Sequence, residues 1–221
     1  MKQILESILN IIYPQICGIC GKMNKKALCN RCQKKIEEEF TFKIDSYEKD
    51  INKNFSEHYY FFKYKDLIRR QILDIKFREK PYISQTIAYF LKNMQKSFEK
   101  LEKYDIIVVV PISKKRQRER GYNQSELIAK KISIMINVPI RKDILYKTQN
   151  TVPQSTLNRE QRTENAKGVY MVKKCQDIKN KKILLIDDIY TTGSTLNECA
   201  RVLRQKGISK ENIGVLTLAK D

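Results

Sequence analysis

The stretch that decides the fold reads Ile183-Leu-Leu-Ile-Asp-Asp-Ile-Tyr-Thr-Thr-Gly-Ser-Thr195. Its first four residues are apolar and fit a short strand that is buried on both faces, as parallel sheets require. The apolar run ends at Asp187-Asp188, and the small residues Thr191-Thr192-Gly193-Ser194-Thr195 follow. A helical pattern then opens, since four apolar residues share one face and a glycine stands just past its end: Leu196, Cys199, Ala200, Leu203 and Gly207.

This order of strand, acidic pair, small-residue loop and helix start predicts a phosphate site at the carboxyl end of a sheet. Small residues let backbone N–H groups close on an anion, Gly193 permits a positive φ, and the helix dipole adds partial positive charge. Two carboxylates would repel a phosphate unless they face a hydroxyl-bearing or metal-bearing part of the same ligand. A sugar phosphate meets that condition. The plainer alternative is a buried strand that ends in two solvated or capping aspartates.

Length and charge bound the class of protein. The 221 residues suit one main α/β domain plus a small appendage. The chain carries 44 Lys+Arg against 25 Asp+Glu, a net charge of +19. This excess favours a polyanionic partner, either a nucleic acid or a multiply phosphorylated substrate. A lysine-rich compositional bias is the alternative.

The chain shows no sign of a membrane-spanning segment. No window holds about 18 consecutive apolar residues, so we expect no transmembrane segment. Residues 1–14 place apolar side chains at helical spacing, include Glu6 among them and lack a small-residue cleavage site after them. They indicate a short amphipathic helix rather than a signal peptide.

Four cysteines form two C-x2-C pairs near the start of the chain: Cys17, Cys20, Cys29 and Cys32. Each pair can turn two thiolates inward, and two such pairs complete a tetrahedral sulfur site, so we expect a structural zinc. Disulfides would need an oxidising compartment, which nothing else in the chain supports. An iron site with the same ligands is a further alternative. Four thiolates leave no open position, which predicts a folding role rather than catalysis.

We expect three parts along the chain. Residues 1–40 hold the N-terminal helix and the cysteine element, residues 41–57 form a linker, and residues 58–221 form the main domain. The linker is expected because the region is charged and carries little periodicity. His58 is the single histidine, and alone it is interpreted as a surface residue rather than a catalyst.

Hydrophobic periodicity predicts the elements of the main domain. Strands are expected at about 58–64, 106–110, 138–140, 144–147, 169–172, 183–186 and 213–218, and helices at about 67–77, 82–98 and 124–136. A further helix is expected after the small-residue loop and before Gly207, as described above. The segment 151–168 is polar and lacks a core face, which is typical of a lid or binding loop.

Five cations directly follow the strand expected at 106–110: Lys114, Lys115, Arg116, Arg118 and Arg120. Ligands of open α/β sheets gather at the carboxyl ends of strands. We therefore expect this basic loop to project over the same crevice as Asp187-Asp188. The alternative is a solvated basic face on which Glu119 pairs with a neighbour at small energetic value.

Three motifs resemble the ComF competence-protein family. They are the segment Arg-Glu-Arg-Gly-Tyr-Asn-Gln at 118–124, the segment Gln-Ser-Thr-Leu at 154–157 with Arg162 and Asn165, and the run 186–195. That run is similar to the phosphoribosyl pyrophosphate (PRPP) motif of type I phosphoribosyltransferases. The family also begins with a four-cysteine zinc element, so the resemblance spans nearly the whole chain. Tyr122 and Tyr170 stand where such sequences commonly carry Phe.

The resemblance implies an α/β fold, namely a parallel-sheet type I phosphoribosyltransferase fold with a small N-terminal zinc-binding element. It also implies a cytoplasmic role in bacterial natural transformation, where incoming single-stranded DNA is handled. It leaves the acceptor substrate, and even turnover of PRPP, open.

On this interpretation Asp187 and Asp188 are the catalytic, ribose-binding acids, and residues 191–195 hold the 5′-phosphate. Magnesium enters with PRPP, whose pyrophosphate meets Lys114, Lys115 and Arg116. No residue is an obvious general base. The candidates for flexible-loop or nucleic-acid contacts are Arg118, Arg120, Tyr122, Asn123, Gln124, Gln154, Arg159 and Arg162.

Two other hypotheses stay open. The same fold can serve as a binding module that holds single-stranded DNA or senses PRPP, with Tyr122 or the aromatics of 59–64 stacking on bases. The zinc element can also dock to a DNA-translocating partner such as a competence helicase.

Overall fold

The structure is a computed structural model that describes residues 16–77, 95–148, 160–161, 166–173 and 176–221. The helix expected at 1–14 and most of the helix expected at 82–98 lie outside the described residues. So does most of the polar segment 151–168, including the candidates Gln154, Arg159 and Arg162.

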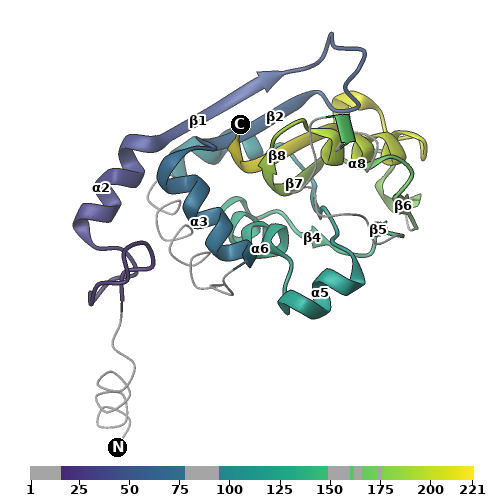
Figure 1. Cartoon of the computed structure of the whole chain (residues 1–221). Coiled ribbons are helices and arrows are strands. Elements are labelled where there is room, and N and C mark those ends of the chain that lie inside the picture. Colours follow the sequence, from purple (N-terminus) through teal and green to yellow (C-terminus); the bar gives the residue numbers. More distant parts are fainter. Residues whose placement is uncertain (1–15, 78–94, 149–159, 162–165, 174–175) are drawn as a thin grey trace, which may run out of the picture.

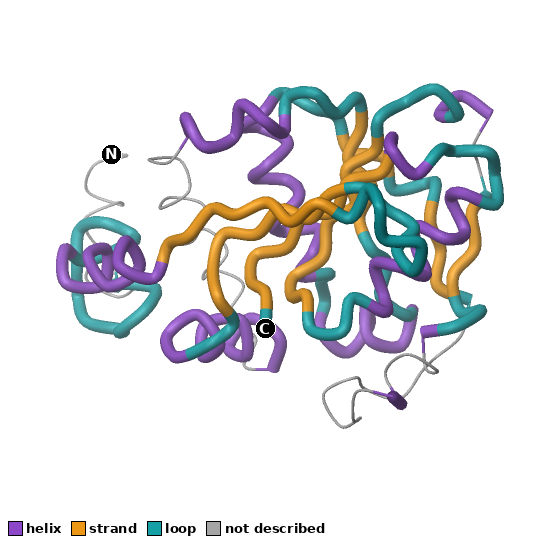
Figure 2. Tube along the Cα trace, turned by 90° about the horizontal axis from the view of Figure 1, so that it is seen from above, coloured by secondary structure: helices purple, strands orange, loops and turns teal. Residues whose placement is uncertain are grey.

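A six-stranded sheet forms the centre of the molecule, with the strand order β1-β2-β8-β7-β3-β4 (Figure 1, Figure 2). The five strands β2, β8, β7, β3 and β4 are parallel to one another, and β1 runs antiparallel to β2 along one edge. β5 and β6 form a separate antiparallel pair. The strand bounds are Phe40–Ser46 (β1), Glu57–Lys63 (β2), Ile106–Val109 (β3), Ile140–Arg141 (β4), Leu145–Lys147 (β5), Tyr170–Val172 (β6), Ile183–Tyr190 (β7) and Ile213–Lys220 (β8).

Helices cover both faces of this sheet. The α-helices are Asn30–Glu39 (α2), Asp66–Phe77 (α3), Lys114–Arg120 (α5), Gln124–Ile136 (α6) and Ser194–Arg204 (α8). The described residues also hold three short 3₁₀ helices, Gln95–Leu101 (η1), Gln176–Ile178 (η3) and Lys210–Asn212 (η4). None of the helices in the described ranges combines the length and apolarity that a bilayer crossing needs.

Alternate residues of the central strands enter two separate hydrophobic cores, because successive side chains of a strand point to opposite faces. Leu184 of β7 packs in the core that holds the apolar face of α6, and Leu185 packs in the core that holds α8. Leu196, Cys199, Ala200 and Leu203, the expected inner face of α8, are all buried. The expected α/β architecture with a mostly parallel sheet is therefore confirmed.

The structure differs from expectation at three places. Residues 41–57 do not form a simple linker, because β1 covers all of 41–46 and pairs with β2. The expected basic loop at 113–120 is the short helix α5, which Ser113 caps by accepting a hydrogen bond from the Arg116 amide at 3.3 Å. The strand expected at 183–186 continues to Tyr190.

The expected surface position of His58 is wrong. Its side chain has no exposed surface, and its Nε2 lies 2.8 Å from Thr217 Oγ1. Its ring stacks on Tyr190, with 4.3 Å between the ring centroids. The histidine belongs to a strand that is buried on both faces, so its isolated position in the sequence was misleading.

Candidate functional site

A cavity of 670 Å³ lies at the carboxyl ends of β3 and β7. Residues from several segments line it: Val110 and Pro111 after β3, Asp187 and Asp188 of β7, Thr191 and Thr195, Arg116 and Arg120 of α5, Gln124 and Ser125 of α6, Lys147 of β5 and Tyr170 of β6. Tyr64, Arg69 and Leu73 line another part of the same cavity. The fold thus brings the acidic pair, the small-residue loop and part of the basic segment to one place.

The acidic pair is held within β7 rather than after it. Asp187 Oδ1 accepts hydrogen bonds from Ser125 Oγ at 2.8 Å and from the Asp188 amide at 2.9 Å. Asp188 is itself buried. Because α6 fixes one carboxylate and the strand holds the other, the pair is positioned before any ligand arrives.

The small-residue loop is shaped by Gly193, which has φ +72° and leads into α8. A Cβ atom there would lie 2.3 Å from the Tyr190 ring, so only glycine fits beneath this ring. Thr192 Oγ1 donates to Ser194 Oγ at 2.9 Å and accepts from the Ser194 amide at 3.3 Å. One loop amide is therefore engaged within the loop, while Thr191 and Thr195 line the cavity.

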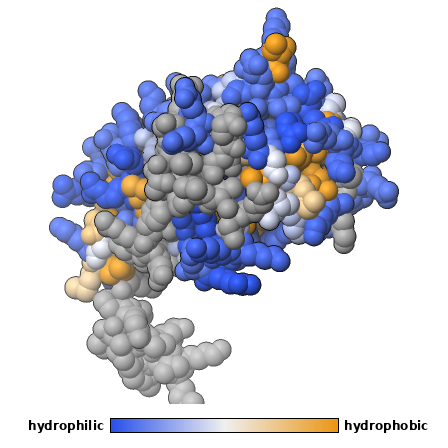
Figure 3. Space-filling view, turned by 45° about the vertical axis from the view of Figure 1, so that its right-hand side comes forward, coloured by the Kyte–Doolittle hydropathy of each residue, from blue (hydrophilic) through white to orange (hydrophobic). Residues whose placement is uncertain are grey.

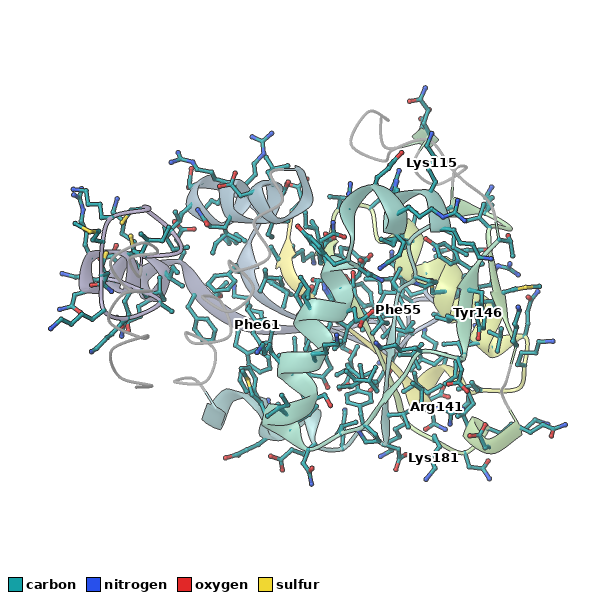
Figure 4. The ribbon with its side chains drawn as sticks, turned by 90° about the horizontal axis from the view of Figure 1, so that it is seen from below. Phe55, Phe61, Lys115, Arg141, Tyr146 and Lys181 are labelled. Carbon is teal, nitrogen blue, oxygen red and sulfur yellow. The ribbon has the colours of Figure 1, made fainter. Side chains whose placement is uncertain are left out.

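The five cations of α5 divide into two groups. Arg116 and Arg120 are half-buried and line the cavity. Lys114, Lys115 and Arg118 are exposed and do not line it; Figure 4 shows Lys115 at the outer edge of the molecule. Burial and the neighbouring Arg116 lower the pKa of the Arg120 guanidinium, while Asp188 opposes this shift. Only part of the basic segment is thus placed to meet a ligand in the cavity.

Two buried nitrogen atoms in the wall have no hydrogen-bond partner among the residues that the structure describes. They are Nη2 of Arg116 and Nε2 of Gln124, whose side chain is only 3% exposed. A buried donor without a partner costs about 1–3 kcal/mol. A ligand with oxygen acceptors would remove this cost if the two side chains turn these nitrogen atoms toward the cavity.

Asn123, a candidate for nucleic-acid contact, uses its side chain for hydrogen bonds within the protein. Its Nδ2 donates to the Val110 carbonyl at 3.0 Å, and its Oδ1 accepts from the Ser125 amide at 3.0 Å. The side chain therefore caps α6 and ties it to the end of β3. Tyr122, beside it, is half-buried and packs against the core on the α6 side of the sheet.

Ser125 and Lys147 are two of the polar wall residues that sequence reasoning missed. A hydrogen bond from Ser125 to an aspartate 62 residues away has no local signal. Lys147 ends a three-residue strand, and no motif marks it as different from the many other lysines. Tyr170, noted above only as a departure from Phe, is buried in the wall beside Lys147.

The four N-terminal cysteines meet in a second candidate site. Their Sγ atoms all lie within 4.8 Å of one another, and those of Cys20 and Cys29 are 3.9 Å apart. Zinc–sulfur bonds of about 2.3 Å in a tetrahedron separate the sulfurs by roughly 3.8 Å, so the donors fit a metal. All four are free thiols. Burial opposes ionisation of Cys17, but backbone hydrogen bonds from Cys20 and Cys29 lower the pKa of that thiol to about 6.

Comparison with known proteins agrees with this architecture. The family model described as "Phosphoribosyl transferase domain" matches residues 91–221. The chain is 32% identical over 149 residues to "Competence protein F" of Haemophilus influenzae, across 66% of this chain and 64% of that protein. It is 29% identical over 212 residues to "Competence protein ComFC" of Bacillus subtilis, across 91% and 77%. It is 29% identical over 112 residues to "DNA utilization protein YhgH" of Escherichia coli K12, across 51% and 48%.

The chain therefore belongs to the phosphoribosyl transferase domain family. Within that family it is similar to the ComF proteins, which confirms the resemblance inferred from the motifs. The matched stretch covers less than two thirds of the Haemophilus protein and about half of the Escherichia protein.

Proposed function

We propose that the chain binds magnesium–PRPP in the cavity between α5 and the 191–195 loop. The observation that carries this proposal is the meeting of Asp187-Asp188, the small-residue loop and Arg116 in a single 670 Å³ cavity. Each of these three elements suits a different part of PRPP, which is a pentose with a phosphate at one end and a pyrophosphate at the other.

The loop would hold the 5′-phosphate with hydroxyls and backbone amides at the start of α8. Asp187 and Asp188 would accept hydrogen bonds from the ribose hydroxyls. Arg116, aided by Arg120, would meet the pyrophosphate and neutralise the charge that grows as the bond at C1 breaks. Magnesium would enter with PRPP, and its positive charge would reduce the repulsion between the phosphates and the two aspartates.

We also propose that the chain acts in DNA uptake. Its relatives carry the names "Competence protein F", "Competence protein ComFC" and "DNA utilization protein YhgH". A phosphoribosyltransferase fold in such a role either turns over PRPP with an acceptor or uses PRPP as a signal. Pyrophosphate release, measured against a panel of acceptors, distinguishes the two.

Calorimetry with magnesium–PRPP tests the binding proposal. Binding should require magnesium and should be lost in the double variant Asp187→Asn/Asp188→Asn. Each change removes a negative charge and replaces one of the two acceptor oxygens of the carboxylate by an NH2 donor. The thermal unfolding of the variant, followed by circular dichroism, serves as the folding control. A folded double variant that binds magnesium–PRPP as tightly as the parent would refute the site assignment.

Binding of single-stranded DNA is the second candidate function, and the exposed cations of α5 favour it. Lys114, Lys115 and Arg118 are exposed and do not line the cavity. Figure 3 shows hydrophilic residues over most of the described surface in that view, as expected for a chain with net charge +19. DNA affinity should fall log-linearly with salt as phosphate contacts release counterions. A DNA affinity that does not change with salt concentration would contradict this mode of DNA binding.

We propose zinc as the metal of the cysteine cluster. Four thiolates and no water position suit a structural tetrahedral zinc site. Elemental analysis of the purified protein tests this, since iron in place of zinc would contradict it.

A further inference from the structure

Lys147 occupies an unusual position in the cavity wall. It is the last residue of β5, where it pairs with Tyr170 of β6, and its Nζ lies 5.3 Å from the centroid of the Tyr170 ring. It is half-buried and lines the cavity together with Arg116 and Asp187. Lys147 is thus part of the wall around the space where the proposed ligand lies.

The groups around Lys147 come from four elements: Arg116 of α5, Tyr170 of β6, Asp187 of β7 and Cys199 of α8. Burial and then the charge of Arg116 lower the pKa of the Lys147 ammonium. Asp187 and Cys199 favour the charged form but do not outweigh these effects. Two cations therefore share a partly desolvated wall, where an additional anion would stabilise both.

Unused donors surround the same space. Nη2 of Arg116 and Nε2 of Gln124 are buried without hydrogen-bond partners among the described residues. Both residues line the cavity with Lys147. An oxyanion offers several acceptor oxygens in one small group, so it suits a wall to which α5, α6 and β5 each contribute a donor.

We propose that Lys147 binds a phosphate oxygen of the ligand, together with the buried donors of Arg116 and Gln124. The proposal rests on the proposed function for the identity of the ligand. The chemistry it requires is an oxyanion, which either the pyrophosphate or the 5′-phosphate can supply. Inorganic pyrophosphate and ribose 5-phosphate are therefore the two probes.

Lys173, which directly follows β6, is a matched control. Its Nζ lies 4.4 Å from the Tyr146 ring, which Figure 4 labels, so it too packs over a tyrosine. Unlike Lys147, it is exposed and does not line the cavity. Both variants, Lys147→Met and Lys173→Met, remove one charge and one cation–π contact.

The experiment measures the affinity of the full chain for each probe, in the presence of magnesium, by calorimetry. Lys147→Met should weaken one of the two probes by about tenfold or more, as expected for a lost charge-assisted hydrogen bond. The weakened probe identifies the phosphate concerned. Lys173→Met should change neither affinity more than about twofold, as expected for a lost exposed charge. Equal affinities for the parent and Lys147→Met overturn the proposal.

The number of protons taken up on binding is a second measurement, and it would not change if Lys147 had only a structural role. An anion raises the lowered pKa of Lys147, so at pH values near that lowered pKa binding should take up a proton in part, and affinity should fall as pH rises through it. Calorimetry in buffers of different ionisation enthalpy, repeated over a pH series that reaches this fall in affinity, gives the number of protons taken up. Lys147→Met should lose this uptake. Lys147→Arg, which stays charged, should bind without it.

The three variants and two probes separate this proposal from the larger one. A parent that binds pyrophosphate or ribose 5-phosphate through Lys147 but fails to bind magnesium–PRPP keeps the proposal and refutes the proposed function. If the parent and Lys147→Met bind magnesium–PRPP with the same affinity and the same proton uptake, the proposed function is kept and the proposal for Lys147 is refuted. If Lys147→Met fails to fold, Lys147→Arg decides through its proton uptake: uptake equal to the parent overturns the proposal. A parent that binds neither probe also overturns it.

Discussion

Gly193 shows how one residue couples the strand to the loop. Its φ of +72° is in the left-handed region, and the Tyr190 ring fills the space where a side chain would stand. The ring is in turn held from behind by His58, on which it stacks. The conformation of the proposed phosphate loop is therefore set by an aromatic stack as well as by the backbone.

Gly193→Ala should destabilise the protein and weaken magnesium–PRPP binding. The left-handed backbone alone costs an alanine about 1–2 kcal/mol, and the clash with Tyr190 must add to it. We expect a loss of about 3 kcal/mol or more in urea unfolding, within the range for overpacked sites. We also expect at least a tenfold loss of PRPP affinity, measured by calorimetry.

Gly207→Ala is the matched control for this change. Gly207 has φ +90°, but no atom lies within 4 Å of a Cβ built there, and it stands beyond α8. Gly207→Ala should lose only the part of the unfolding free energy that the left-handed backbone costs, and its affinity for the ligand should be unchanged. Equal losses of stability in the two variants would mean that the Tyr190 ring moves aside at no cost.

His58 should stay neutral throughout the neutral pH range. Burial, followed by the charges of Lys220 and Lys53, lowers its pKa from 6.5 to about 3. Asp45 lies 3.9 Å away, but Lys220 binds its carboxylate. Because His58 is the only histidine, its ring gives a single imidazole signal in NMR, and that signal should not titrate between pH 7.5 and 5.

The same shift predicts how stability depends on pH. His58 is protonated below about pH 6.5 in the unfolded chain, but only below about pH 3 in the folded chain. Stability should therefore fall as pH falls, by about 1.4 kcal/mol from this residue between pH 7.5 and 5.5. His58→Gln keeps a donor for Thr217 and should lack this part of the loss. The same slope in parent and variant would contradict the assignment.

At the scale of elements, α5 has two chemically similar but differently placed sides. Arg116 reaches the cavity, whereas Arg118, two residues along, is exposed. Arg116→Gln should weaken magnesium–PRPP binding by at least about tenfold, since it removes a charge-assisted contact. Arg118→Gln should leave PRPP affinity within twofold and should reduce the affinity for single-stranded DNA and its salt slope.

Both variants are compared by calorimetry with PRPP and by fluorescence anisotropy with a single-stranded oligonucleotide. Each serves as the other's control, because both remove one arginine from the same seven-residue helix. If the two variants lose PRPP affinity equally, the division of α5 into two sides has no functional meaning.

The elements that the sequence predicted well are those with strong periodicity. α6 and β7 begin where expected, since each is an apolar pattern of the appropriate period next to a polar boundary. α5 was missed because it has no buried face, although Ser113 and Gly121 are ordinary cap residues. β1 was missed although Phe40, Phe42 and Ile44 alternate, because lysine and acidic neighbours dominate the region.

The candidate site was predictable only where its residues are adjacent in the sequence. The run 183–195 carries its own signal, since the strand, the carboxylates and the loop follow one another. Lys147 and Ser125 join the site through tertiary contacts, and both are common residue types in ordinary positions. His58 looked exposed because a lone polar residue gives no sign of the sheet that covers it.

At the scale of the whole molecule, the cysteine element is not a separate appendage. Leu28, Cys32 and Ile36 belong to the same hydrophobic core as Phe61 of β2, and α2 leads directly into β1. Figure 4 shows sulfur atoms gathered at the end of the molecule that holds α2. The metal site should therefore support the edge of the central sheet as well as its own loops.

Metal removal should destabilise the molecule from this edge inward. Metal binding to the four thiolates stabilises the folded state only, so chelation should lower the melting temperature by about 2–4 °C for each kcal/mol lost. Cys20→Ser/Cys29→Ser should lose the metal and reproduce the shift, and added zinc should restore the parent but not the variant. Hydrogen exchange should quicken first in α2 and β1, and least in β7, which lies between β8 and β3. An unchanged exchange rate in β1 after metal loss would show that the cysteine element is independent of the sheet, despite the shared core.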